Sequence, residues 1–161
     1  HMKRIFGIIF LVPFFSFAQI QSKVVSIADG DTFTLLTKEK KQIKVRLYGI
    51  DCPEKGQPIS NVCKQYLSNL IFYKDVNVED KGKDRYGRTL GIVFVDTVNI
   101  NESLLAAGMA WHYKQYDKNK EWAEMEKRAR SEKKGLWKDE KPIAPWETRA
   151  DRRSGKKDSL E

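Results

Sequence analysis

The chain has few residues that could bind a transition metal through sulfur or imidazole: its 161 residues include two cysteines and two histidines. Cys52 and Cys63 lack the spacing of a zinc site, and too few sulfur or histidine ligands lie near them to complete one. A chain of this length can also bury a core without disulfides. A Cys52–Cys63 disulfide stays open at this point, with a slight preference for two free or buried thiols. No internal repeat is evident.

The sequence also lacks an apolar run that spans a bilayer comfortably. Its longest run, Ile5–Phe17, is shorter than the ~20 residues that a membrane-spanning helix needs. Two basic residues precede this run, a small-x-small motif ending at Ala18 follows it, and no cysteine lies nearby to suggest a lipoprotein. We therefore predict a secretory signal peptide over residues 1–18, with His1 as a cloning remnant and export to the periplasm or the medium. An N-terminal membrane anchor is the alternative.

Acidic residues are in the minority. The chain has 22 Asp and Glu against 30 Lys and Arg, which gives a net charge of +8 and a pI near 9.4. Such a charge suggests an anionic partner, namely nucleic acid, an acidic membrane or another polyanion. On charge alone, a solvated basic surface is the preferred explanation. A hydrophobic content of 40% indicates a globular chain rather than a disordered one.

The order of predicted elements indicates a small β-barrel. Period-two alternation and turn residues predict strands over Lys23–Ile27, Thr32–Thr37, Gln42–Ile50, Val76–Val78 and Leu90–Val95. Apolar spacing and capping patterns predict helices over Ser60–Phe72, from Asn99 to Gly108, and over Lys120–Lys134. Five short strands, with one helix inserted between the third and the fourth, favour an α+β fold: a five-stranded OB-fold barrel with three α-helices.

Two helices have a predicted apolar face. In the first helix this face consists of Val62, Tyr66, Leu67 and Leu70, and in the last helix of Trp122, Met125 and Ala129. Trp122 is therefore expected in the core rather than on a stacking surface. The predicted domain covers residues 19–141, and residues 142–161 form a charged tail that we expect to be flexible, although part of it could fold back.

Two acidic clusters follow strand-like runs in this basic protein: Asp29-Gly30-Asp31-Thr32 and Asp51-Cys52-Pro53-Glu54. Hard cations such as calcium bind carboxylates, backbone carbonyls and water, so Asp31, Asp51 and a carbonyl near Cys52 could hold one, with Asp29 behind them. In isolation, Asp29-Gly30-Asp31 is better explained as an ordinary turn, because Asp and Gly favour turns.

The same segments contain the groups that phosphodiester hydrolysis needs. A carboxylate such as Glu54 can activate water as a general base. A cation can polarise a phosphoryl oxygen, and planar guanidinium groups such as those of Arg46 and Arg88 can hold the phosphate and the charge that grows on it. Singly, these residues could be solvated surface groups, and the joint pattern is the more specific signal.

These segments, with a third block at Asp84-Arg85-Tyr86-Gly87-Arg88, resemble the signature blocks of the staphylococcal nuclease (thermonuclease) family. The block Asn101–Leu105 with Gly108-Met109-Ala110 resembles the family's second helix, and Gly135-Leu136-Trp137 the close of its third. The resemblance covers about Lys23 to Trp137. It implies a calcium-dependent endonuclease that hydrolyses DNA and RNA to products with 3′ phosphates.

The resemblance also assigns roles to individual residues. It implies calcium ligation by Asp31, Asp51 and the carbonyl of Cys52, catalysis by Arg46, Glu54 and Arg88, and nucleotide binding by Arg85, Tyr86 and either Tyr113 or Tyr116. His112 is expected to be an ordinary surface histidine. The loop after Glu54 is shorter than in the type member of the family, and the tail from Pro142 is an extension.

Other classes of function stay open. A non-catalytic OB module that binds nucleic acid is the main alternative, although the five catalytic and metal-binding side chains favour an enzyme. A calcium-stabilised structural domain is a third possibility. Nothing in the sequence suggests an obligate dimer or stable membrane association after signal cleavage, so we expect a monomer.

Overall fold

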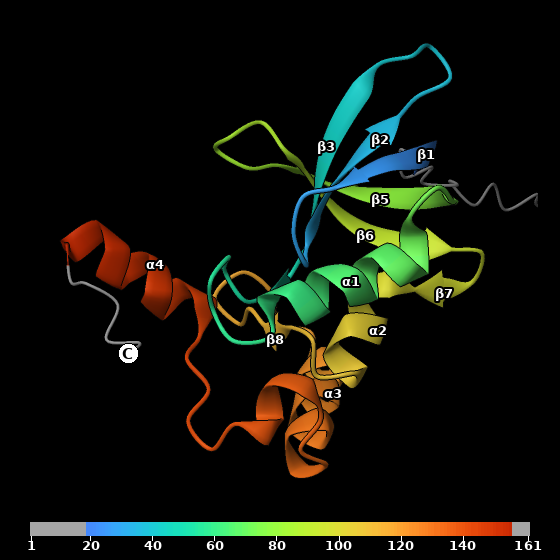
Figure 1. Ribbon diagram of the computed structural model, residues 1–161. Helices are drawn as coiled ribbons and strands as arrows, with labels where there is room; N and C mark the ends of the chain where they lie inside the picture. The colour runs from blue at the N-terminus through green and yellow to red at the C-terminus, as the bar shows by residue number, and fades with distance from the viewer. Residues whose placement is uncertain (1–18, 156–161) are drawn as a thin grey trace, which may run out of the picture.

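The computed structural model describes residues 19–155, and five of its strands close into a barrel (Figure 1). They are β1 (Gln19–Ile27), β2 (Thr32–Leu36), β3 (Gln42–Leu47), β5 (Asp75–Lys83) and β6 (Thr89–Val95). Antiparallel pairing runs in the order β3-β2-β1-β5-β6, and parallel pairing of β3 with β6 closes the ring. A short strand, β7 (Val98–Asn99), extends β6 as a hairpin. The predicted five-stranded OB-type barrel and α+β class are confirmed.

Alternate residues of the barrel strands fill the core. The fully buried side chains include Val24, Phe33, Leu35, Val45 and Val78, as the period-two pattern requires. Close packing also depends on a residue without a side chain in β6. A Cβ atom at Gly91 would lie 2.4 Å from the Val78 Cγ1 atom, so only glycine fits there.

The third predicted strand is shorter than expected, and the difference matters for the site. β3 ends at Leu47, and Gly49 adopts a positive φ of 71° that turns the chain. The chain then enters β4 (Ile50–Asp51), which pairs with β8 (Trp111–His112) in a separate two-stranded sheet. The turn therefore moves Asp51 out of the barrel sheet and onto a second support.

Three predicted helices are present: α1 (Ser60–Ile71), α2 (Ile100–Ala106) and α3 (Lys120–Ser131). Asn99 caps α2 by accepting from the Glu102 N–H, as predicted. Trp122 lies in the core, also as predicted. The predicted face of α1 was partly wrong, because Val62 is 52% exposed and the buried line is Cys63, Leu67 and Ile71. These three residues are spaced by four, which keeps them on one side of the helix.

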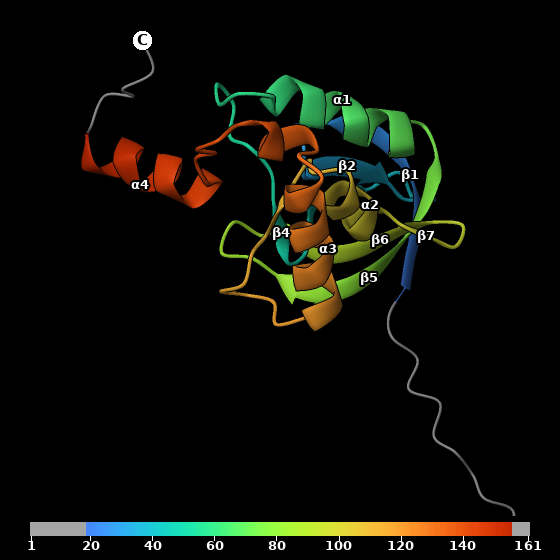
Figure 2. The same ribbon diagram turned by 90° about the horizontal axis from the view of Figure 1, so that it is seen from below.

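The C-terminal part is more ordered in secondary structure than the sequence analysis expected. A 3₁₀ turn, η1 (Gly135–Lys138), is followed by a fourth helix, α4 (Pro145–Ser154), which begins with proline and ends at Gly155 in a left-handed conformation. Figures 1 and 2 show α4 extending beyond the body of the domain, beside the chain that follows β4. Charged residues dominate this segment, so apolar periodicity could not predict its helix.

A small second core joins η1 and the start of α4 to the domain. Its buried members are Trp111, Ala129, Leu136, Trp137 and Ala144, and Trp146 packs against them. None of the helices within residues 19–155 is long and apolar enough to cross a membrane. The predicted signal peptide, residues 1–18, lies outside the described residues.

Candidate active site

Asp31 and Asp51 lie at neighbouring strand ends, as the sequence analysis predicted. Asp31 precedes β2, and its carbonyl accepts a hydrogen bond from the Leu47 N–H at the end of β3. Asp51 is the last residue of β4. The two residues are 5% and 1% exposed. Two carboxylates buried to this extent need partners, because an unpaired buried charge is costly.

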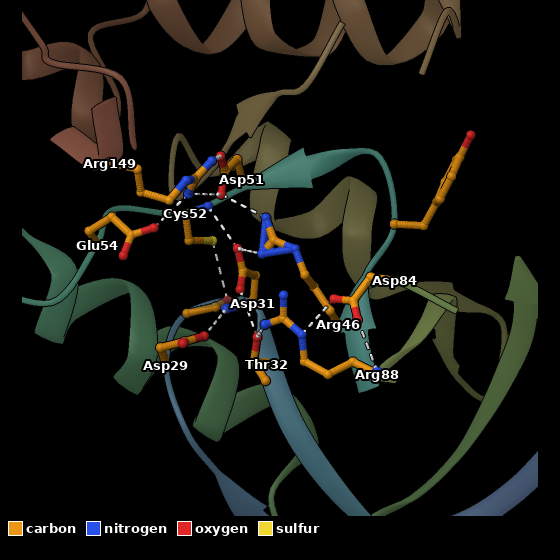
Figure 3. Close-up of polar contacts among 12 residues, drawn as sticks. Asp29, Asp31, Thr32, Arg46, Asp51, Cys52, Glu54, Asp84, Arg88 and Arg149 are labelled. Carbon is orange, nitrogen blue, oxygen red and sulfur yellow. Dashed lines mark hydrogen bonds and ion pairs between the residues drawn. The ribbon is translucent and has the colours of Figure 1, made fainter. Parts of the chain in front are cut away.

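Arg46 joins the two aspartates. Its Nη1 lies 3.1 Å from Asp31 Oδ2 and its Nη2 lies 2.8 Å from Asp51 Oδ1 (Figure 3). Both carboxylates therefore approach one guanidinium group from different strands. Burial opposes the charge on Arg46, but the two aspartates outweigh it and raise the pKa of this arginine. The structure thus brings together three of the residues that the sequence analysis proposed for one site.

Cys52 fixes the two acidic clusters against each other. Its backbone N–H donates to Asp31 Oδ2 at 3.0 Å, and its thiol donates to the Gly30 carbonyl at 3.3 Å. A Cβ atom at Gly30 would lie 2.9 Å from the Cys52 Cβ atom, so this approach requires glycine. Cys52 and Cys63 are both free and buried. Burial raises the pKa of the Cys52 thiol well above its ordinary value, so the thiol is a packing group rather than a nucleophile.

Asp29 shapes the turn that carries Asp31, since its Oδ1 accepts a hydrogen bond from the Asp31 N–H at 3.1 Å. Loss of hydration and the negative charge of Asp31 raise the pKa of Asp29 to about 6. Burial likewise raises the pKa of Asp51, against the hydrogen bond from Arg149. Crowded carboxylates of this kind are chemically suited to a hard cation, which would relieve their repulsion.

The protein supplies only part of a coordination shell. Within residues 19–155, no group of three or more Asp, Glu, His or Cys side chains is arranged to hold a metal ion. Asp31 and Asp51 offer two carboxylates, so a cation here would complete its shell with backbone carbonyl and water oxygens, as calcium and magnesium commonly do. The donor set therefore fits a hydrated hard cation and does not fit zinc.

Arg88 reaches the Asp31 side of the site from the turn between β5 and β6. Its Nε donates to Asp84 Oδ2 at 2.7 Å, and its Nη1 lies 3.4 Å from the Thr32 hydroxyl. That hydroxyl in turn donates to Asp31 Oδ1 at 3.0 Å. Thr32 therefore links Arg88 to the aspartate pair, as Figure 3 shows. The sequence analysis placed Arg88 in the site but gave no role to Thr32.

Asp84 holds the turn that carries Arg88. Its Oδ1 accepts from the backbone N–H groups of Tyr86 and Arg88 at 2.9 and 3.0 Å. Burial alone would raise the pKa of Asp84, but these bonds and the Arg88 side chain lower it. Asp84 thus accepts three hydrogen bonds and holds the Arg88 guanidinium through Nε, so neither terminal nitrogen is used by Asp84 and Nη1 reaches Thr32.

Glu54 faces the aspartates across an arginine that sequence reasoning missed. Arg149 of α4 places its Nη1 2.5 Å from Glu54 Oε1 and its Nη2 2.6 Å from Asp51 Oδ2. Glu54 itself is held by its N–H, which donates to the Gln57 side chain at 2.7 Å. Arg149 lies 98 residues from Asp51 in the chain, in a charged stretch that carried no motif.

The predicted nucleotide-binding residues form two aromatic groups, in which Tyr86 and Tyr116 are exposed and Tyr113 is half-buried. Tyr86 is 69% exposed, with the Arg85 and Arg88 guanidinium carbons 4.8 and 5.5 Å from its ring centre. Tyr113 and Tyr116 meet edge to face, with ring centres 4.8 Å apart. Tyr113 also stacks on Trp146 at 5.1 Å and an interplanar angle of 4°. The C-terminal segment therefore already occupies one face of Tyr113.

His112 is not the surface histidine that the sequence analysis expected, because it is buried in β8. Its Nε2 lies 2.7 Å from Asp117 Oδ2, and its N–H donates to Glu126 Oε2 at 2.5 Å. Glu126 also pairs with Arg130 at 3.1 Å. Because β8 pairs with β4, this buried glutamate of α3 supports the strand that carries Asp51. The prediction that His112 lies on the surface was wrong because β8 has only two residues, too few to show the alternation of a strand in the sequence.

Comparison with known proteins identifies the family of the chain. Residues 44–139 match the family model described as staphylococcal nuclease homologue. An endonuclease of Haemophilus influenzae, described as uncharacterized, is 47% identical over 123 residues, which cover 76% of this chain and 69% of that protein. The micrococcal nuclease of Shigella flexneri is 38% identical over 154 residues, covering 89% of this chain and 88% of that protein. The chain belongs to the staphylococcal nuclease family.

Proposed function

We propose that this protein is a calcium-dependent endonuclease that hydrolyses both DNA and RNA and leaves 3′ phosphates. Membership of the family supports a hydrolase of the staphylococcal nuclease type that acts on nucleic acid. The observation that carries the more specific proposal is the bridge that Arg46 makes between Asp31 and Asp51, with Arg88 and Glu54 beside it. The proposed metal-binding, base and phosphate-binding groups thus lie beside one another.

Calcium would be held by Asp31, Asp51 and the Cys52 carbonyl, with water completing the shell and Asp29 supporting the turn. Bound there, it would polarise a phosphoryl oxygen of the substrate. The same aspartates now accept from Arg46, so this arginine is already aimed at the place where a phosphate would meet the cation. Its planar fork can hold two phosphate oxygens.

Glu54 is the proposed general base. It would take a proton from a water molecule as the water oxygen bonds to phosphorus and the bond to the 5′ oxygen breaks. Arg46 and Arg88 would stabilise the negative charge that develops on the phosphoryl oxygens. The 5′ oxygen leaves with a proton from solvent, so the phosphate remains on the 3′ side.

The two aromatic groups would supply the substrate surface. Tyr86 between Arg85 and Arg88 can stack on a base while the arginines bind a neighbouring phosphate. Tyr113 and Tyr116 offer a second stacking surface on the loop after β8. Stacking and phosphate contacts do not distinguish DNA from RNA, which supports activity on both and a preference for flexible or single strands.

The test compares Glu54→Gln, Arg46→Ala and Arg88→Ala with wild type on single-stranded DNA, with calcium or with a chelator. We expect losses of about 10²–10⁴-fold for the glutamate and about 10²–10³-fold for each arginine, and no activity in chelator. Glu140→Gln and Arg128→Ala remove the same groups from exposed positions and serve as matched controls. Cleavage in chelator, or unchanged rates in all three variants, would refute the mechanism, and tight salt-sensitive binding without cleavage would favour a binding module.

We further propose that the protein is exported, with cleavage before Gln19, and acts as a monomer. The apolar run after two basic residues supports export. Amino-terminal sequencing of protein recovered from the periplasm or the medium tests the cleavage, and light scattering tests the monomer. A mature chain that retains residues 1–18 in the membrane fraction would contradict export.

A further inference from the structure

We propose that α4 competes with calcium for the site, because the Arg149 guanidinium occupies the Asp51 oxygens that the cation would use and also pairs with Glu54. This inference rests on the calcium dependence proposed above. The family match ends at residue 139, so α4 lies outside the part of the chain that the family model describes. A role for α4 therefore has to come from its own contacts.

The contacts of α4 include Asp51, a proposed calcium ligand, and Glu54, the proposed general base. Arg149 Nη2 donates to Asp51 Oδ2 at 2.6 Å, and Nη1 lies 3.3 Å from Asp51 Oδ1 and 2.5 Å from Glu54 Oε1. One positive group thus uses both oxygens of a metal ligand and one oxygen of the general base. Arg149 is 32% exposed and Asp51 is 1% exposed, so the arginine closes the aspartate from the solvent side.

The alternative role for Arg149 is that of a third phosphate clamp, because Arg46 also pairs with carboxylates and is nevertheless proposed to hold the phosphate. The two arginines differ in their partners. Arg46 joins Asp31 to Asp51, whereas Arg149 pairs with both oxygens of Asp51 and with Glu54, the proposed base. Calcium and the attacking water would need these same oxygens, so Arg149 competes for them, and the calcium affinity of an Arg149 variant decides between the two roles.

Two further sets of contacts hold the helix over the site. The Gln57 side chain accepts from the Glu54 N–H at 2.7 Å and donates to the Ile143 carbonyl at 3.0 Å, which ties the catalytic loop to the segment before α4. On the other side, Trp146 stacks on Tyr113 at 5.1 Å. The same segment therefore covers a metal ligand, the base and a proposed stacking surface, which are the groups that calcium and nucleic acid would use.

The attachment is strong at Trp146 and weak beyond it. Trp146 packs against Trp111 of the second core, with ring centres 5.4 Å apart. From Arg149 onward the contacts with the domain are the ion pairs of Arg149, a 3.9 Å ion pair from Arg152 to Glu54, and a hydrogen bond of 2.9 Å from Arg152 Nη2 to the Lys55 carbonyl. Partly exposed ion pairs are individually weak, so this end of α4 can give way to calcium while the start stays docked.

The decisive measurement is calcium affinity by titration calorimetry without nucleic acid, on wild type, Arg149→Gln and Arg153→Gln. Arg153 is exposed on the same helix, so its substitution removes an equal charge and serves as the matched control. We expect Arg149→Gln to bind calcium about tenfold more tightly than wild type, because charge-assisted hydrogen bonds to Asp51 and Glu54 no longer compete. Arg153→Gln should stay within about twofold of wild type, the effect of a screened surface charge.

A second readout follows the helix itself. Hydrogen exchange of residues 145–154 in wild type should accelerate when calcium is added, while exchange in β2 and β3 stays unchanged or slows. Circular dichroism confirms that each variant is folded before titration. Slower exchange in α4 with calcium would overturn the proposal, because the helix would then be part of the calcium-bound state.

The outcomes separate this proposal from the proposed function. Equal calcium affinity in all three proteins would overturn the competitor and leave the nuclease mechanism intact. So would a loss of cleavage in Arg149→Gln with unchanged calcium affinity, which would mark Arg149 as a phosphate clamp. Absence of calcium binding in all three proteins would overturn the calcium assignment and the competitor together.

Discussion

The two halves of the candidate site are built in different ways. Asp31 and Asp51 are buried, and Arg46, which joins them, is 15% exposed, whereas Arg149 and Glu54 meet across a helix and a loop that are partly exposed. The first group depends on backbone pairing in the barrel and between β4 and β8. The second depends on a few side chains and can change without unfolding the barrel. We call Asp31, Arg46 and Asp51 the platform, and α4 with Arg149 the cover. The difference suggests that the platform is rigid and that the cover can move.

Core substitutions should show this difference most strongly. Phe33 is fully buried in the barrel, so Phe33→Ala should lower the free energy of unfolding by about 4 kcal/mol. Trp146 is half-buried, and Trp146→Ala should cost about 1–2 kcal/mol, chiefly by releasing the C-terminal segment. Urea unfolding measures both values. Equal costs would mean that the second core is as essential to the fold as the barrel.

The two arginines that contact Asp51 provide a sharper comparison. Arg46→Ala leaves Asp31 and Asp51 buried without the charge that joins them, and we expect a loss of about 3 kcal/mol in the free energy of unfolding. Arg149→Ala removes a partly exposed arginine, and Arg46 remains to pair with Asp51, so its cost should be about 1 kcal/mol.

Added calcium should affect the stability of Arg46→Ala and Arg149→Ala differently. By occupying the aspartates it should recover part of the stability lost in Arg46→Ala, since a ligand that binds only the folded state stabilises it. Melting temperatures with calcium and with chelator measure this recovery. A larger loss from Arg149→Ala than from Arg46→Ala would reverse the assignment of platform and cover.

The platform could be predicted from the sequence, because short segments of sequence indicate its strands and the charged residues near their ends. Alternation predicted the barrel strands, and the acids and arginines lie at strand ends that the OB topology brings together. The cover could not be predicted in this way. The Arg149 contact spans 98 residues, and nothing in a charged run distinguishes this arginine from Arg153. His112 and Glu126 were missed for a related reason, since a two-residue strand has no periodicity to detect.

Salt should produce the smallest effect and still separate the two regions. Between about 0.1 M and 1 M sodium chloride the screening length falls from about 10 Å to about 3 Å, which weakens exposed ion pairs more than buried ones. Hydrogen exchange in residues 149–154 should therefore rise by a few fold at high salt, whereas exchange at Asp31 and Arg46 should change little, because these side chains are 6% and 15% exposed. Sodium sulfate at matched ionic strength controls for specific effects of chloride. If α4 kept its protection at high salt, the stacking of Trp146 on Tyr113 rather than the arginine pairs would be holding the cover closed, and Trp146→Ala would then be the variant that opens the site.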